Sequence, residues 1–322
     1  MLDINQLNKL CAEHLSVSTD RVKQIDKYLM KDWSVHCISL EDEFFLDFIN
    51  KKQNAEAYER YVKLIDSRIS KSGGNIDLET DEETKAFYSS LCKKPFGSWC
   101  MSARRAHVLS GLVAVDSVVS LVKPKSILEF GSGFGFASHW CASRHAVPCH
   151  GFDFSEDVVS YAKGAVKKPT GATFETADFF KYKPSCTYDF VFGIAGLPRR
   201  PTPGDLKLVS EWVTDGGLVL IISPTSIGGI LEVSGRNDDL HVIYDGASGG
   251  YLGWGGPGDY QTQRVTLLIK GPPPDGLIPN ITDVYNTWGD FANLVNNFPV
   301  PDRERNFAFY NSWGRPIKYP VL

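Results

Sequence analysis

A glycine-rich turn constrains the fold of this chain more than any other feature of its sequence. The segment Glu129-Phe130-Gly131-Ser132-Gly133-Phe134-Gly135 follows an apolar run at 126–130 and precedes a helix-like stretch. Glycines at alternate positions let the backbone approach a ligand without side-chain obstruction, and the following helix points its N-terminus at that ligand. The turn therefore predicts a nucleotide-type site between a β-strand and an α-helix.

Short apolar runs alternate with helix-like segments on both sides of this turn. A long helix is expected over 102–122, ending before Lys123-Pro124. The predicted strands lie at 126–130, 148–152, 172–176, 188–193 and 218–223, and the predicted helices between them at 136–144, 156–166 and 203–213. Strands and helices that alternate in this way indicate right-handed crossovers and a largely parallel sheet with helices on both faces.

Two later runs, 241–244 and 262–269, are joined by a glycine-rich loop and are predicted to pair as a hairpin at one sheet edge. The expected fold is therefore α/β, a Rossmann-like, mostly parallel seven-stranded sheet with an antiparallel edge hairpin. We expect three parts: a helical N-terminal segment at 1–101, a core at 102–270, and an aromatic, proline-rich tail at 271–322 that packs on the core.

The spacing of the glycines excludes two common nucleotide sites. A dinucleotide-binding turn reads Gly-x-Gly-x-x-Gly, which would need a glycine or alanine where Phe136 stands. A P-loop needs Gly-Lys followed by Ser or Thr, which is absent here. The pattern acidic-x-Gly-x-Gly-x-Gly, with Glu129 as the acidic residue, instead resembles the first motif of class I S-adenosylmethionine-dependent methyltransferases.

Later residues stand where this resemblance would place them. In the family, the acid that ends the second strand, here Asp153, accepts hydrogen bonds from both ribose hydroxyls, and Phe154 would lie against the adenine. Asp178 follows the third strand, where a carboxylate accepts from the adenine amino group and the next N–H, of Phe179, donates to the ring. Gly193 in the fourth strand is implied to lie beside the methionine portion. The cofactor-binding residues that the resemblance implies are Glu129, Gly131, Ser132, Gly133, Gly135, Asp153, Phe154, Asp178, Phe179 and Gly193.

The resemblance implies S-adenosylmethionine as the cofactor, S-adenosylhomocysteine as its product, and no metal. The formal net charge of −4, from 34 basic and 38 acidic residues, gives no global attraction to nucleic acid, although it leaves a local basic patch open. No apolar run is long enough to span a bilayer. The 7 cysteines form no Cys-x-x-Cys pair and favour free thiols, so we expect a cytosolic protein without membrane contact.

The methyl acceptor is not encoded in the cofactor motif, because the methyl group is already electrophilic and the enzyme mainly has to orient the acceptor. We expect direct in-line transfer to a small-molecule metabolite and assign no catalytic residue. Arg199, Tyr251 and Trp254 are the candidate substrate-binding residues. Two alternatives stay open: methylation of RNA or an RNA cap, and a non-catalytic cofactor-binding module with a regulatory or structural role.

Overall fold

The computed structural model describes the central part of the chain and portions of both ends. The described residues are 3–13, 15, 17–18, 20–21, 24–25, 27–28, 105–165, 170–194, 196–197, 202–224, 239–247, 263–281, 309–310 and 316–317. Most of the predicted N-terminal segment 1–101 and most of the predicted tail 271–322 lie outside them. The division into three parts therefore stays a prediction.

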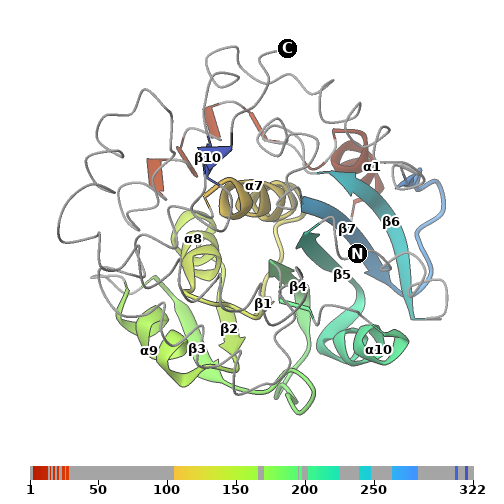
Figure 1. Cartoon of the computed structure of the whole chain (residues 1–322). Coiled ribbons are helices and arrows are strands. Elements are labelled where there is room, and N and C mark those ends of the chain that lie inside the picture. Colours follow the sequence, from red (N-terminus) through yellow and green to blue (C-terminus); the bar gives the residue numbers. More distant parts are fainter. Residues whose placement is uncertain are drawn as a thin grey trace.

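One mixed sheet forms the centre of the molecule, with the strand order β3-β2-β1-β4-β5-β7-β6-β8 (Figure 1). Neighbouring strands from β3 to β5 are parallel, and β7 is antiparallel to both β5 and β6. The strands are β1 Ile127–Phe130, β2 Cys149–Asp153, β3 Ala172–Thr176, β4 Tyr188–Ile194, β5 Val213–Pro224, β6 Leu240–Ala247, β7 Gln263–Lys270 and β8 Asn280–Ile281. The predicted Rossmann-like sheet and its antiparallel hairpin are confirmed.

The prediction of seven strands was wrong by one. The short strand β8 pairs in parallel with β6 and gives the sheet an eighth strand. It comes from the segment assigned to the tail, where two residues of strand are too short for a period-two pattern to be recognised. Residues 309–310 and 316–317 form a separate two-stranded sheet, β9 and β10.

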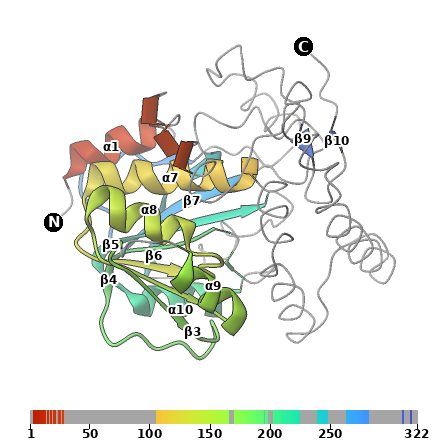
Figure 2. The same cartoon turned by 90° about the vertical axis from the view of Figure 1, so that its left-hand side faces the viewer.

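Helices cover both faces of the sheet, as predicted (Figures 1 and 2). One face carries α1, α7, α8 and α9, and the other carries α10. Their bounds are α1 Ile4–Ala12, α7 Arg105–Val122, α8 Phe136–His145, α9 Glu156–Gly164 and α10 Pro203–Trp212. α10 begins with a capping box in which Thr202 and Asp205 bond each other's backbone N–H groups, and a proline follows the cap.

Alternate residues of the central strands pack into two separate hydrophobic cores, one on each face of the sheet. In β4, Phe190 and Phe192 join the core beneath α7 and α8, whereas Val191 joins the core with Trp212 of α10. All three side chains are fully buried. Strands buried on both faces read as continuous apolar runs, and this is why the sequence showed them so clearly.

Helix α1 and the segment after β7 meet beside β6. The side-chain amide of Asn8 in α1 donates to the carbonyl of Gly276 at 3.1 Å, and its oxygen accepts from the N–H of Ile278 at 2.9 Å. The Asn280 amide donates to the carbonyl of Cys11 at 2.9 Å. These bonds hold the segment that leads into β8 against α1.

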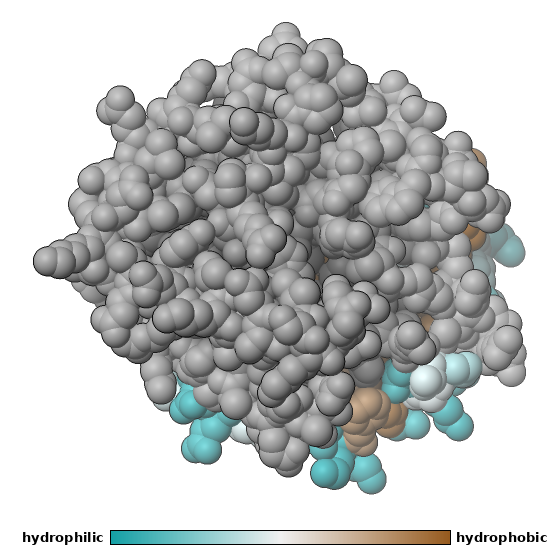
Figure 3. Space-filling view, viewed as in Figure 1, coloured by the Kyte–Doolittle hydropathy of each residue, from teal (hydrophilic) through white to brown (hydrophobic). Residues whose placement is uncertain are grey.

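Where described residues are coloured in Figure 3, hydrophilic side chains flank a small hydrophobic patch. Within the described part of the chain, the exposed large hydrophobic side chains are Phe180, Ile278 and Ile281. Among the described residues, no helix has both the length and the apolar character needed to cross a membrane.

Candidate cofactor site

The glycine turn lies between the end of β1 and the start of α8. Gly131, Gly133 and Gly135 all have left-handed backbone, with φ of 62°, 51° and 80°. At Gly131 a Cβ would stand 2.6 Å from the Cα of Gly196, a residue that follows β4. The turn is therefore packed against the chain that leaves β4, and only glycine fits there.

Gly133 is also left-handed, but it is not packed against another part of the chain. A Cβ built on it would meet no protein atom within 4 Å, in contrast to Gly131. The backbone at Gly133 is therefore uncovered by the described residues, as a turn that cradles a ligand requires. Ser132 between the two glycines is buried, and its N–H donates to the carbonyl of Phe152 at 2.9 Å, which holds the turn on β2.

Glu129 anchors the helix that follows the turn. Its Oε2 accepts from the N–H of Ser138 at 3.1 Å and from the Ser138 hydroxyl at 2.5 Å. Burial raises the pKa of Glu129 to about 8, and the two bonds from Ser138 only partly oppose that effect. Through these two bonds to Ser138, Glu129 holds the first turn of α8 next to the glycines.

Asp153 joins the glycine turn to the end of β2. Its Oδ2 accepts from the N–H of Gly133 at 3.0 Å, and its Oδ1 accepts from the N–H of Ser155 at 3.0 Å. The residue is 7 % exposed, and burial raises the pKa of its carboxyl above the usual value despite these bonds. Phe154, the next residue, is half-buried. The turn and the acid predicted to act together are in direct contact.

Asp178 and Phe179 follow β3, and the resemblance implies that both contact the adenine. Their side chains have different surroundings. Asp178 accepts from the N–H of Phe180 at 2.9 Å and pairs with the ammonium of Lys181 at 3.0 Å. The ring of Phe179 turns into the core below the sheet, where it lies 5.1 Å from Trp212 between ring centroids. Only the backbone of Phe179 is left to face a ligand, and among the described residues no group accepts from its N–H.

Gly193 has a packing role that the sequence did not reveal. A Cβ there would overlap the ring of Phe130, so glycine is needed to let β4 lie against that side chain. Gly196 was not singled out from the sequence, yet its backbone contacts both Gly131 and Phe130. Gly196 lies in a loop without a recognisable motif, so the sequence alone gave no reason to single it out.

All of these residues lie at the carboxyl ends of neighbouring parallel strands, where α/β sheets bind their ligands. Arg199, Tyr251 and Trp254 fall outside the described residues. Within the described part of the chain, no group of three or more His, Cys, Asp or Glu side chains is arranged to hold a metal. The candidate site is therefore built from backbone, the two buried acids Glu129 and Asp153, and the partly exposed Asp178.

The strand order, the antiparallel β7, the glycine turn after β1 and the acid that closes β2 form the Rossmann-like α/β fold that the resemblance to class I S-adenosylmethionine-dependent methyltransferases implied. No protein-family model matches the sequence, and no curated protein matches it.

Several solved structures are similar at low identity. Phosphoethanolamine N-methyltransferase 2 of Haemonchus contortus, in complex with S-adenosyl-L-methionine, is 24% identical over 31% of this chain and 24% of its own, with a TM-score of 0.28. The chain thus spans about a quarter of that protein. Magnesium protoporphyrin IX methyltransferase of Synechocystis matches over 61% of this chain and 100% of its own at 14% identity, with a TM-score of 0.44. The N-methyltransferase NodS of Bradyrhizobium japonicum matches over 59% and 99% at 10% identity, with a TM-score of 0.46. Similarities at this level carry no argument about activity.

Proposed function

We propose that this chain binds S-adenosylmethionine at the glycine turn and transfers its methyl group to a small-molecule acceptor. The observation that carries the proposal is the bond of 3.0 Å from the N–H of Gly133 to Asp153, which sets a buried carboxylate beside an uncovered turn. A buried carboxylate beside an open turn suits a ligand that offers hydroxyl groups.

The remaining acceptor capacity of Asp153 fits a ribose. A carboxylate has about four lone-pair positions, and Asp153 accepts from the backbone N–H groups of Gly133, Ser155 and Phe154. The remaining position is available for a ribose hydroxyl. Such bonds to an ionised acceptor are about twice as strong as neutral ones.

The segment after β3 fits an adenine. The Asp178 carboxylate is partly exposed, and the ion pair that it makes with Lys181 involves an ammonium that is 83% exposed, so water or a ligand can compete for the carboxylate. In the proposal Asp178 accepts from the adenine amino group, the N–H of Phe179 donates to the ring, and the half-buried Phe154 supplies an apolar surface beside it.

When bound, this cofactor supplies a methyl group that its sulfonium makes electrophilic. The residues of the chain then have to bind the ends of the cofactor, hold the acceptor in line and keep water out. The glycine turn and Asp153 would do the first. We propose no general base, and we propose Arg199, Tyr251 and Trp254 for the acceptor.

The net charge of −4 supports a small acceptor over a polyanion. A cytosolic location is part of the proposal. The four described cysteines, Cys11, Cys141, Cys149 and Cys186, are free thiols, as expected in a reducing compartment.

A labelled-methyl assay tests the proposed activity. The full chain is incubated with methyl-labelled S-adenosylmethionine and with separate small-molecule, RNA and protein fractions of a cell extract. We expect label in the small-molecule fraction, and we expect Asp153→Asn to abolish most of it. Label in RNA alone would contradict the proposed acceptor class. Binding of the cofactor without any labelled product would leave the non-catalytic alternative as the better account.

A further inference from the structure

Glu129 and Asp153 are buried carboxyl groups that have no cationic partner among the described residues. Glu129 is 2 % exposed, and its hydrogen bonds come from the N–H and the hydroxyl of Ser138. Asp153 is 7 % exposed and accepts from backbone N–H groups. Neither acid takes part in an ion pair within the described part of the chain. Buried carboxylates in proteins are normally paired with a cation, so the chain itself leaves these two unbalanced.

The two neighbouring strands β1 and β2 place both acids on one face of the sheet. Glu129 lies in register with Gly151, and Asp153 follows Gly151 by two residues in β2. Side chains alternate along each strand, and residues in register on parallel neighbours share a face. Because Glu129 bonds to Ser138 in α8, both acids face the side of the sheet that α8 covers. They form a pair of acids beneath the glycine turn.

These surroundings keep a proton on Glu129 while no ligand is bound. Burial is the largest cause that raises the pKa of Glu129 to about 8, and the charge of Asp153 adds to it. Cys141 in α8 also interacts with Glu129, and a bond with Cys149 and burial raise the pKa of its thiol, which stays neutral. On the other side of β1, Phe192 of β4 lies in register with Glu129 and carries no charge. A carboxyl group with a pKa of about 8 is about 90 % protonated at pH 7.

The strand order locates the charged end of the proposed cofactor. The strands β3, β2 and β1 are neighbours in that order (Figure 1). In the proposed function the adenine lies beside Asp178 after β3, and the ribose lies beside Asp153 at the end of β2. A cofactor that continues in the same direction brings its methionine part, which carries an ammonium group, to the end of β1. Glu129 is the last residue but one of that strand.

We propose that Glu129 releases its proton to solvent when a ligand that carries an ammonium group binds at the glycine turn. This inference rests on the proposed function. The ammonium group supplies the positive charge that the chain does not provide, so the ionised carboxylate becomes the stable form in the complex. The O–H bond of the carboxyl group breaks, its electron pair stays on the carboxylate, and the proton passes to the buffer. The complex then holds one proton fewer than the free protein, so the affinity rises as the pH rises towards 8.

Calorimetric titration of the full chain with S-adenosylhomocysteine counts the protons, when it is repeated at pH 7 in two buffers that differ in ionisation enthalpy. We expect the release of close to one proton per ligand, and binding that is roughly tenfold tighter at pH 7 than at pH 6. 5′-Methylthioadenosine, which keeps the nucleoside and lacks the ammonium group, should bind without proton release.

Two variants assign the proton to its residue. Glu129→Gln should bind S-adenosylhomocysteine without proton release and equally well at pH 6 and pH 7, because glutamine has no proton to lose in this range. Glu211→Gln, at an exposed carboxyl group on α10, is the matched control and should release the proton as wild type does. The proton count of the wild-type chain tests the proposal even if Glu129→Gln does not fold.

Three outcomes would overturn the inference. The first is binding of S-adenosylhomocysteine by the wild-type chain without proton release, and the second is equal release on binding of 5′-methylthioadenosine. The third is undiminished release by Glu129→Gln, which would assign the proton to another group. Binding without release contradicts this inference alone, whereas no binding of S-adenosylhomocysteine overturns the proposed function as well.

Discussion

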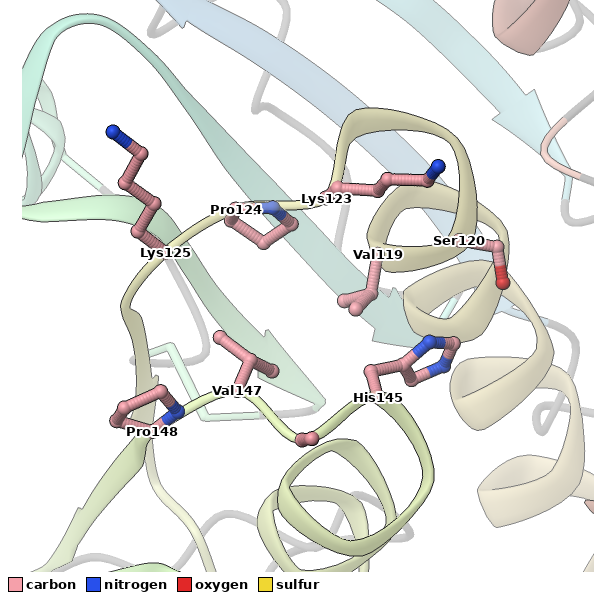
Figure 4. A pocket seen from close by; sticks show the side chains of 9 residues that line it. Val119, Ser120, Lys123, Pro124, Lys125, His145, Val147 and Pro148 are labelled. Atoms are coloured by element: carbon pink, nitrogen blue, oxygen red, sulfur yellow. The ribbon is translucent and has the colours of Figure 1, made fainter.

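The two edges of the parallel sheet are built in different ways. At the carboxyl edge the left-handed backbone falls on glycines, and the acids Glu129 and Asp153 are buried beneath the turn. At the amino edge the left-handed positions are Lys123 and Ala146, and side chains from the ends of α7 and α8 line a pocket there (Figure 4). A site made from backbone leaves glycines at fixed spacing in the sequence. A pocket made where two helix ends meet leaves no such mark.

The largest expected effect comes from the buried acid at the carboxyl edge. The pKa of Glu129 is raised from its usual 4.5 to about 8, so the folded state favours the protonated form. The stability that this form supports is complete below pH 4.5 and is lost as the pH rises towards 8. The free energy of unfolding should fall by roughly 4 kcal/mol over that range because of this residue.

Denaturant titrations between pH 4 and pH 8 measure this effect. Glu129→Gln should remove most of the slope, since glutamine is neutral at every pH and its oxygen still accepts from Ser138. Glu211→Gln, an exposed carboxyl on α10, should keep the wild-type slope. Equal slopes in wild type and Glu129→Gln would show that Glu129 is ionised in the folded protein at neutral pH.

The second prediction compares two glycines of one turn. Gly131→Ala should destabilise the protein by roughly 3 kcal/mol, because it combines a left-handed backbone with overlap against Gly196. Gly133→Ala is the matched change at a left-handed position without neighbouring atoms and should cost only about 1 kcal/mol. Thermal unfolding of both variants checks the difference. Equal costs would mean that the turn is not packed against the chain after β4.

The third prediction concerns binding at the turn. Asp153→Asn should weaken the binding of S-adenosylhomocysteine by roughly 1–3 kcal/mol, because it removes the charge of the carboxylate that accepts from the ribose. Asp157→Asn, in the exposed first turn of α9, is the control and should bind as wild type. Calorimetry gives both affinities. Unchanged affinity in Asp153→Asn would show that this carboxylate does not contact the ligand.

The smallest effect is expected at the amino edge. Lys123→Gly should stabilise the protein by about 1 kcal/mol, because glycine adopts the left-handed backbone at φ 51° without strain. Thermal unfolding of the variant and of wild type measures the difference. A loss of stability would show that the Lys123 side chain is needed for folding.

Much of the carboxyl edge was predictable from sequence. The apolar strands, the glycine spacing and Asp153 are local patterns, and the fold brings them together as predicted. The direction of the Phe179 ring was not predictable, because only the tertiary core with Trp212 decides which way it turns. The packing role of Gly193 depends likewise on Phe130, a residue far away in the sequence.

The contacts at the amino edge could not be predicted from the sequence, for a related reason. His145 contacts Asp116 only because α7 and α8 cross, and neither residue stands in a recognisable motif. The strand β8 depends on Asn8 and Asn280, which lie about 270 positions apart in the sequence. Long-range contacts of this kind determine pockets and edge strands, and sequence periodicity does not record them.

The binding of S-adenosylhomocysteine to the wild-type chain tests the central claim most directly. A ligand that binds only the folded state stabilises it by about 2.7 kcal/mol at a hundredfold excess over its dissociation constant. We predict a clear, saturable rise in melting temperature with S-adenosylhomocysteine and none with NAD. No rise with S-adenosylhomocysteine together with a rise with NAD would contradict the assignment of the glycine turn.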